Sequence, residues 1–132
     1  MSSRRSQYIL VIDDDPDIRQ VLQDRLEFYG FSVETAEDGP SALHKLNSFT
    51  PHCIFLDLLL PGMDGIEVLH RIKAQDHSIP IIIVTAAVTP EVASATTAKT
   101  ALAYLSKPFE LPQLRQIIEQ WVEQPSGSED CL

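Results

Sequence analysis

Short apolar runs of strand length alternate along this chain with longer segments whose apolar residues recur at helical spacing. This alternation is typical of βα units, in which each strand of a parallel sheet is followed by a helix that covers one face of the sheet. Strands that are apolar throughout favour a sheet that is buried on both faces. The sequence therefore predicts an α/β fold with five βα units. The predicted strands are 8–12, 32–36, 53–56, 81–84 and 103–105.

Capping residues, prolines and glycines mark the helices between these strands, and apolar residues three or four positions apart give each helix one inward face. The first helix follows a capping Asp15 and is expected to turn Ile18, Val21, Leu22, the stem of Arg25 and Tyr29 inward before Gly30 ends it. Two further helices are predicted over about 40–47 and over 89–101. Another begins at Gly65 and turns Ile66, Leu69 and Ile72 inward. The last runs over 111–123 and has one apolar stripe, made of Leu111, Leu114, Ile117, Ile118, Trp121 and Val122.

The length and charge of the chain exclude several classes of protein. Its 132 residues suffice for one domain, and its net charge of −9 disfavours binding to nucleic acid or to anionic lipid. The apolar run 79–88 falls short of the roughly 20 residues that a membrane span needs, and no export signal is visible. Two cysteines, Cys53 and Cys131, form no disulfide framework. We expect a cytoplasmic protein that binds neither nucleic acid nor membrane.

Polar side chains follow four of the five predicted strands, at the point where each strand ends. Asp13 and Asp14 follow the first, Asp57 the third, Thr85 the fourth and Lys107 the fifth. A single aspartate in such a place commonly caps a helix. In an open parallel sheet, however, ligands bind beyond the carboxyl ends of the strands, so that all five side chains are expected to converge on one site.

Four motifs surround these residues: Val11-Ile12-Asp13-Asp14-Asp15-Pro16; Leu56-Asp57 with Pro61-Gly62-Met63-Asp64-Gly65; Val84-Thr85-Ala86; and Tyr104-Leu105-Ser106-Lys107-Pro108-Phe109. In this order and at these intervals, they resemble the receiver domain of two-component response regulators. On this basis residues 7–124 are assigned to a receiver domain. Residues 1–6 are expected to be a disordered N-terminal segment, and residues 125–132 a mobile C-terminal tail or linker stub.

The resemblance implies a single-domain, doubly wound (βα)5 sandwich of three layers, with a flavodoxin-like parallel sheet in the order 2-1-3-4-5. It implies that Asp57 accepts a phosphoryl group from a sensor histidine kinase or a histidine phosphotransfer protein. The domain would be a signalling domain and not an enzyme in the ordinary sense, since it would catalyse only its own phosphorylation and slow autodephosphorylation. The signal would pass to a downstream effector protein or domain, and a phosphorylation-dependent homodimer is left open.

Clustered carboxylates repel one another, so that the expected site should hold a cation or contain a carboxyl group with a raised pKa. A site of oxygen ligands alone, without a nearby cluster of Cys or His, favours Mg²⁺. By the resemblance, Asp14 and Asp57 would give carboxylate oxygens and Leu59 its backbone carbonyl, while Asp13 would help to hold the ion directly or through water. Mn²⁺ would be an acceptable substitute.

The resemblance also assigns phosphoryl-binding and switch residues. Lys107 would pair with Asp57 before transfer and with a phosphoryl oxygen afterwards, while Thr85 would donate its hydroxyl to another oxygen. Ala86 leaves space beside the site, and Tyr104 occupies the position of the switch aromatic. The Lys107-Pro108 peptide bond would be cis, which would aim Lys107 inward.

The resemblance implies that two positions tune the lifetime of the acyl phosphate, namely Leu59 and Ala87, two residues after Asp57 and Thr85. Neither side chain can orient a hydrolytic water, which predicts slow autodephosphorylation. The predicted helix 89–101 contains poor helix formers, among them Ser94 and Thr96. It is therefore predicted to be the least protected helix and to move on phosphorylation.

Two other classes of function compete with this interpretation. In a Mg²⁺-dependent phosphohydrolase, Asp13 would be the nucleophile and Asp15 the acid, although Asp17 stands where such enzymes carry threonine. A phosphorylation-independent interaction module would need the site residues only for folding. A flavin-binding protein is weaker still, because no aromatic residues flank the loops at the strand ends.

Overall fold

Five parallel strands form the central sheet, in the order β2-β1-β3-β4-β5. The structure is a computed structural model that describes residues 8–76, 78–86, 90, 94 and 101–123. The predicted α/β class and strand order are therefore confirmed. The strands are β1 (Tyr8–Ile12), β2 (Ser32–Ala36), β3 (Cys53–Leu56), β4 (Ile81–Thr85) and β5 (Ala103–Ser106).

The three inner strands are apolar because helices cover both of their faces. All of β3 and β4 is buried, and only Tyr8 is exposed in β1. The edge strands β2 and β5 are mostly half-buried or exposed instead, and only Ala36 and Leu105 are buried in them. Strands β4 and β5 each extend one residue beyond the predicted end, to Thr85 and Ser106.

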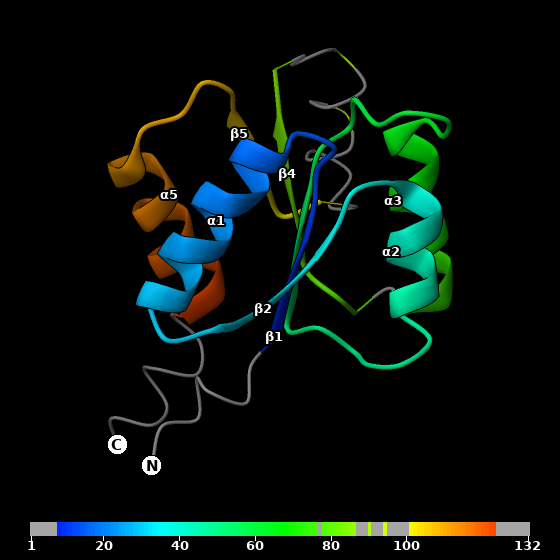
Figure 1. Cartoon of the computed structure of the whole chain (residues 1–132), viewed down its shortest axis with the longest axis horizontal. Helices are drawn as coiled ribbons and strands as arrows, with labels where there is room; N and C mark the ends of the chain where they lie inside the picture. The colour runs from blue at the N-terminus through cyan, green and yellow to red at the C-terminus, as the bar shows by residue number, and fades with distance from the viewer. Residues whose placement is uncertain (1–7, 77, 87–89, 91–93, 95–100, 124–132) are drawn as a thin grey trace.

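In the part of the chain that the structure describes, four helices complete the three layers (Figure 1). Helices α1 (Pro16–Phe28) and α5 (Leu111–Ile117) cover one face of the sheet, and α5 continues as a π-helical segment, η2 (Ile118–Glu123). Helices α2 (Gly39–Lys45) and α3 (Gly65–Gln75) cover the other face. Each face therefore has its own hydrophobic core, because successive side chains of a strand point to opposite faces of a sheet.

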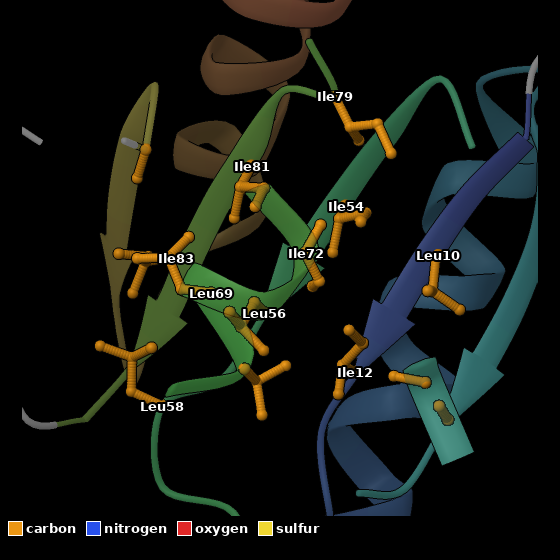
Figure 2. Close-up of a cluster of buried hydrophobic side chains, with 14 residues drawn as sticks. Leu10, Ile12, Ile54, Leu56, Leu58, Leu69, Ile72, Ile79, Ile81 and Ile83 are labelled. Carbon is orange, nitrogen blue, oxygen red and sulfur yellow. The ribbon is translucent and has the colours of Figure 1, made fainter. Parts of the chain in front are cut away.

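The core under α3 shows how the strands are held together. Figure 2 shows Leu10 and Ile12 of β1, Ile54 and Leu56 of β3, and Ile81 and Ile83 of β4 on the face where Leu69 and Ile72 of α3 lie. All of these side chains are completely buried. Because this packing fixes the neighbouring strands in register, it also fixes where their carboxyl ends lie.

The first and last helices face the core with a slightly different side from the one predicted. Leu22 and Leu26 of α1 are buried, whereas Val21 is 44% exposed. Leu114 and Ile118 are buried in the last helix, whereas Leu111 is 39% exposed. In each helix the buried pair is four residues apart and so lies on one line along the helix. The predictions that Val21 and Leu111 point inward were wrong.

The ends of the helices agree with the predicted capping signals. Asp15 caps α1, and its side chain accepts a hydrogen bond from the Asp17 N–H at 2.9 Å. Gly30 follows this helix with a φ of 103°, in the left-handed region that favours glycine. The second helix begins one residue before the predicted Pro40, because Asp38 is its cap.

Several predictions concern residues that the structure does not describe. They are most of the helix over 89–101, the side chains of Trp121 and Val122, Ala87, Cys131 and the two terminal segments. Of the helices that lie in the described part of the chain, none is long and apolar enough to cross a membrane.

Candidate functional site

The carboxyl ends of the parallel strands bring the predicted site residues to one edge of the sheet, the upper edge in Figure 1. Asp13 follows β1 and Asp57 follows β3, and the last residues of these two strands, Ile12 and Leu56, are paired in the sheet. The Asp57 N–H donates a hydrogen bond to the Ile12 carbonyl at 2.9 Å, which extends the pairing into the loops. The sheet register therefore places the two aspartates side by side.

Three carboxylates form a compact acidic cluster at this edge. Asp13, Asp14 and Asp57 each offer an oxygen, and the three oxygens lie within 4.8 Å of one another. Asp13 and Asp57 are buried, whereas Asp14 is exposed. The predicted convergence of the three aspartates is present in the structure.

Lys107 provides the positive charge of the site. Its ammonium donates hydrogen bonds to Oδ2 of Asp13 at 2.7 Å and to Oδ2 of Asp57 at 2.9 Å. The Lys107 N–H donates to the Thr85 carbonyl at 2.9 Å, and the Lys107-Pro108 peptide bond is cis. Pairing of Lys107 with Asp57 was predicted, but the shorter contact with Asp13 was not. The sequence carried no signal that distinguishes the two aspartates as partners.

Burial and charge act in opposite directions on these groups. Burial raises the pKa of the Asp13 carboxyl, the Lys107 hydrogen bond lowers it, and the net result is a raised pKa. Burial alone would lower the pKa of Lys107, but its hydrogen bonds to Asp13 and Asp57 outweigh this effect and raise the pKa. The site thus contains a carboxyl with a raised pKa, as predicted, but burial contributes more to this shift than repulsion by Asp57 does.

Backbone N–H groups orient the two buried carboxylates in the same way. Oδ1 of Asp13 accepts a hydrogen bond from the Asp15 N–H, and Oδ1 of Asp57 accepts one from the Leu59 N–H, both at 3.0 Å. In each aspartate the other oxygen, Oδ2, faces Lys107. Each carboxylate is therefore held between its own loop and the shared lysine.

The loop after Asp57 is held close to the start of α3. The Gly65 N–H donates to the Leu58 carbonyl at 3.2 Å. A Cβ at Gly65 would lie only 2.3 Å from the Leu58 Cα. Gly65 was predicted only to open the helix, and its close contact with the loop backbone was missed because sequence does not show how near two segments approach.

The other predicted site residues lie around the cluster. Thr85 is completely buried at the end of β4. Tyr104 is 42% exposed on the edge strand β5, where it pairs with Ile83, and Ala86 is exposed. Thr85 and Ala86 therefore lie at the carboxyl end of β4, whereas Tyr104 lies two residues before the end of β5. Ala87 lies outside the described residues.

Arg19 is a further residue of the site that the sequence reasoning missed. It lies in α1, and its Nη1 donates a hydrogen bond to the backbone carbonyl of Asp13 at 2.7 Å. An arginine one turn into the helix that follows an acidic loop is the signal that could have found it.

The donor set of the cluster fits a small divalent cation. Each of the three carboxylates offers an oxygen, and hard cations such as Mg²⁺ prefer oxygen ligands. The buried negative charge of Asp13 and Asp57, which Lys107 offsets only in part, favours a second cation at the same place.

Comparisons with known proteins agree with this arrangement. A family model described as "Response regulator receiver domain" matches residues 9–119. The chain is 39% identical over 106 residues to response regulator MprA of Mycolicibacterium vanbaalenii, an alignment that covers 80% of this chain and 46% of that protein. The chain thus spans about half the length of the curated relatives it matches.

Two solved structures share the fold. The response regulator TrrA of Thermotoga maritima, in complex with Mg(2+)-BeF, is 32% identical with a TM-score of 0.75, and the match covers 86% of this chain and 97% of TrrA. A CheY-like receiver domain protein of Methanospirillum hungatei is 27% identical with a TM-score of 0.84, over 92% of this chain and 98% of that one.

Proposed function

This chain belongs to the response regulator receiver domain family, a family of signalling domains, and we propose that Asp57 is its phosphoryl acceptor. The phosphoryl donor is the phosphohistidine of a sensor histidine kinase or a histidine phosphotransfer protein. One observation carries the assignment: the buried Asp57 carboxylate is part of a cluster of three carboxylates and contacts the Lys107 ammonium at 2.9 Å.

The strand order supports Asp57 over Asp13 as the acceptor. Asp57 directly follows β3, which lies between β1, followed by Asp13 and Asp14, and β4, which ends at Thr85. A phosphoryl group on Asp57 therefore has carboxylates on one side and Thr85 on the other. Asp13 is one strand farther from Thr85 than Asp57 is.

The proposed transfer is a nucleophilic substitution at phosphorus. A carboxylate oxygen of Asp57 forms the new P–O bond while the P–N bond of phosphohistidine breaks, and the imidazole leaves as a neutral ring after taking up a proton. Lys107 turns from Asp57 to a phosphoryl oxygen of the product, an acyl phosphate. The chain thereby promotes its own phosphorylation, and the partner supplies the phosphoryl group.

Mg²⁺ is the proposed cofactor, with Mn²⁺ as a substitute. The carboxylates of Asp13, Asp14 and Asp57 and the backbone carbonyl of Leu59 would hold it, and when bound it neutralises negative charge between the acceptor and the incoming phosphate. The Mg(2+)-BeF complex of the similar protein TrrA supports this choice.

The output of the domain requires two conformations. Moving a population from 1:99 to 99:1 needs about 5.5 kcal/mol of differential stabilisation. One hydrogen bond to a charged group supplies only about 1.5–3 kcal/mol, so that Thr85 cannot drive the change alone. We therefore assign the switch to Thr85 and Lys107 acting together, with the half-exposed Tyr104 as the aromatic that repacks. The recipient is a downstream effector protein or domain, or a second copy of the chain.

Labelling with acetyl [³²P]phosphate in Mg²⁺ tests the proposal. Wild type and Asp13→Asn should become labelled, the latter more slowly, whereas Asp57→Asn should not. EDTA should prevent labelling. Loss of labelling in Asp13→Asn together with its retention in Asp57→Asn would instead support the phosphohydrolase interpretation. An intact signalling phenotype in Asp57→Ala would support a phosphorylation-independent module.

A further inference from the structure

We propose that Arg19 is a positioning residue for the metal ligands, and that it sets the affinity for Mg²⁺ by fixing the peptide unit between Asp13 and Asp14. The inference rests on the proposed Mg²⁺ site. Its basis is the hydrogen bond from Arg19 Nη1 to the Asp13 carbonyl at 2.7 Å, which joins α1 to the acidic loop.

Every other polar group of Asp13 is held by a different part of the fold. Its N–H donates to the Ala36 carbonyl at the end of β2, Oδ1 accepts from the Asp15 N–H, and Oδ2 accepts from Lys107. The carbonyl is the one group that faces Arg19. Because the carbonyl of Asp13 and the N–H of Asp14 belong to the same rigid peptide plane, Arg19 also orients the backbone of Asp14.

Asp14 depends on this orientation more than the other two aspartates do. Asp13 and Asp57 are buried and each accepts a backbone N–H, whereas the Asp14 side chain is exposed. Packing therefore does little to hold its carboxylate within reach of the others. A fixed backbone at Asp14 is the simplest way to keep three oxygens within 4.8 Å.

The structure also explains why an arginine is able to do this. The Arg19 N–H donates to the Asp15 carbonyl at 3.0 Å in the first turn of α1, so that the backbone of Arg19 is itself anchored. Its long side chain returns toward the loop and also borders a polar hollow of about 240 Å³. The hollow provides space for a substituted side chain, and its other lining residues are Thr35, Ala36, Glu37, Ser41 and Lys45.

A positioning role and a purely electrostatic role of Arg19 predict opposite effects of its removal on the affinity for Mg²⁺. If only its positive charge acted on the site, its removal would reduce repulsion of Mg²⁺ and tighten binding. If Arg19 positions the ligands, its removal weakens binding, because groups that orient metal ligands typically contribute about 10-fold to 100-fold in affinity. The direction of the change therefore separates the two roles.

The experiment is calorimetric titration of the whole chain with Mg²⁺ alone. Arg19→Met should raise the Kd about tenfold relative to wild type. The matched control is Arg71→Met, which also removes an arginine from a helix but only breaks an exposed pair with Glu67 at 2.9 Å; its Kd should stay close to that of wild type. Thermal unfolding in EDTA shows whether each variant is folded.

A Kd for Arg19→Met that is unchanged or lower than that of wild type would overturn the inference. Absence of Mg²⁺ binding by wild type would instead overturn the proposed metal site. If Arg19→Met does not fold, Arg19→Gln, whose side chain is too short to reach the carbonyl, takes its place under the same criteria.

Discussion

The ammonium of Lys107 lies 2.7 Å from Oδ2 of Asp13, closer than the 2.9 Å that separates it from Oδ2 of Asp57. The lysine thus bridges the loops after β1 and β3 from its own loop after β5. Its side chain is 16% exposed and its two partners are almost completely buried. In the protein without metal, Lys107 is the cation that offsets the repulsion between these carboxylates.

Replacement of Lys107 by methionine should therefore destabilise the protein without metal. Loss of one partner from a buried ion pair typically costs about 3–5 kcal/mol, because the remaining charge is uncompensated. Urea unfolding in EDTA measures the effect. The control is Lys45→Met, which breaks an exposed pair with Glu34 and should cost less than about 1 kcal/mol. Equal losses in the two variants would contradict a structural role for the Lys107 bridge.

Gly65→Ala should both destabilise the fold and disturb the acidic site. The added Cβ would lie 2.3 Å from the Leu58 Cα and 2.5 Å from the Leu58 oxygen, which are backbone atoms that cannot rotate away. We expect a loss of about 3 kcal/mol in the free energy of unfolding and weaker Mg²⁺ binding, because the loop that carries Leu59 must shift. Urea unfolding and Mg²⁺ titration measure the two effects.

Gly62→Ala is the matched control for this steric effect. A Cβ at Gly62 meets no atom within 4 Å, but the φ of 79° strains a residue with a side chain. The expected cost is roughly 1–2 kcal/mol. A Gly65→Ala variant that is no less stable than Gly62→Ala would show that the loop and α3 are not in close contact.

The buried thiol of Cys53 should make the free energy of unfolding depend on pH in the alkaline range. Burial raises the pKa of its thiol from 9.0 to about 12. The pKa of this thiol is higher in the folded than in the unfolded state. The stability that the neutral thiol contributes to the folded protein is therefore fully present below pH 9 and is lost as the pH rises toward 12. Within that window the free energy of unfolding should fall by about 1.4 kcal/mol per pH unit relative to Cys53→Ala.

Chemical unfolding of the two proteins at a series of pH values measures this difference, with Cys131→Ser as the common background. In the same background, a thiol reagent at pH 8 should modify Cys53 only after unfolding, since the thiolate is the reactive form. Rapid modification of the folded protein would show that the thiol is accessible.

The phosphorylated protein should lose its label slowly. Leu59 is 55% exposed beside the proposed acceptor, and an aliphatic side chain cannot orient an attacking water. Decay of the labelled protein after removal of donor should take minutes or longer, and Leu59→Gln should accelerate it. Leu111→Gln, which alters an exposed leucine in α5, should leave the decay unchanged. Loss of label from wild type within seconds would contradict the prediction.

Much of the fold was predictable because the relevant signals are local in sequence. Runs such as 81–84 are apolar at every position, which only a strand with two covered faces requires. Asp15 caps α1 through its side chain and Gly30 follows the helix with a positive φ, so that both signals act within a few residues of the helix ends. The predicted inward faces were wrong at Val21 and Leu111, because the stripe of apolar residues on a helix is broader than the line of residues that contacts the sheet.

The sequence by itself determined which polar residues meet, since parallel strands that end in Asp13, Asp57, Thr85 and Lys107 present them at one edge of the sheet. Only the tertiary structure decided how they pair: the lysine bridges two aspartates and Arg19 holds the Asp13 carbonyl. The physical reason is that strand order and register place a residue to within one strand spacing, about 4.8 Å. A hydrogen bond of 2.7 Å depends on side-chain rotamers and loop paths, which packing of the whole chain selects.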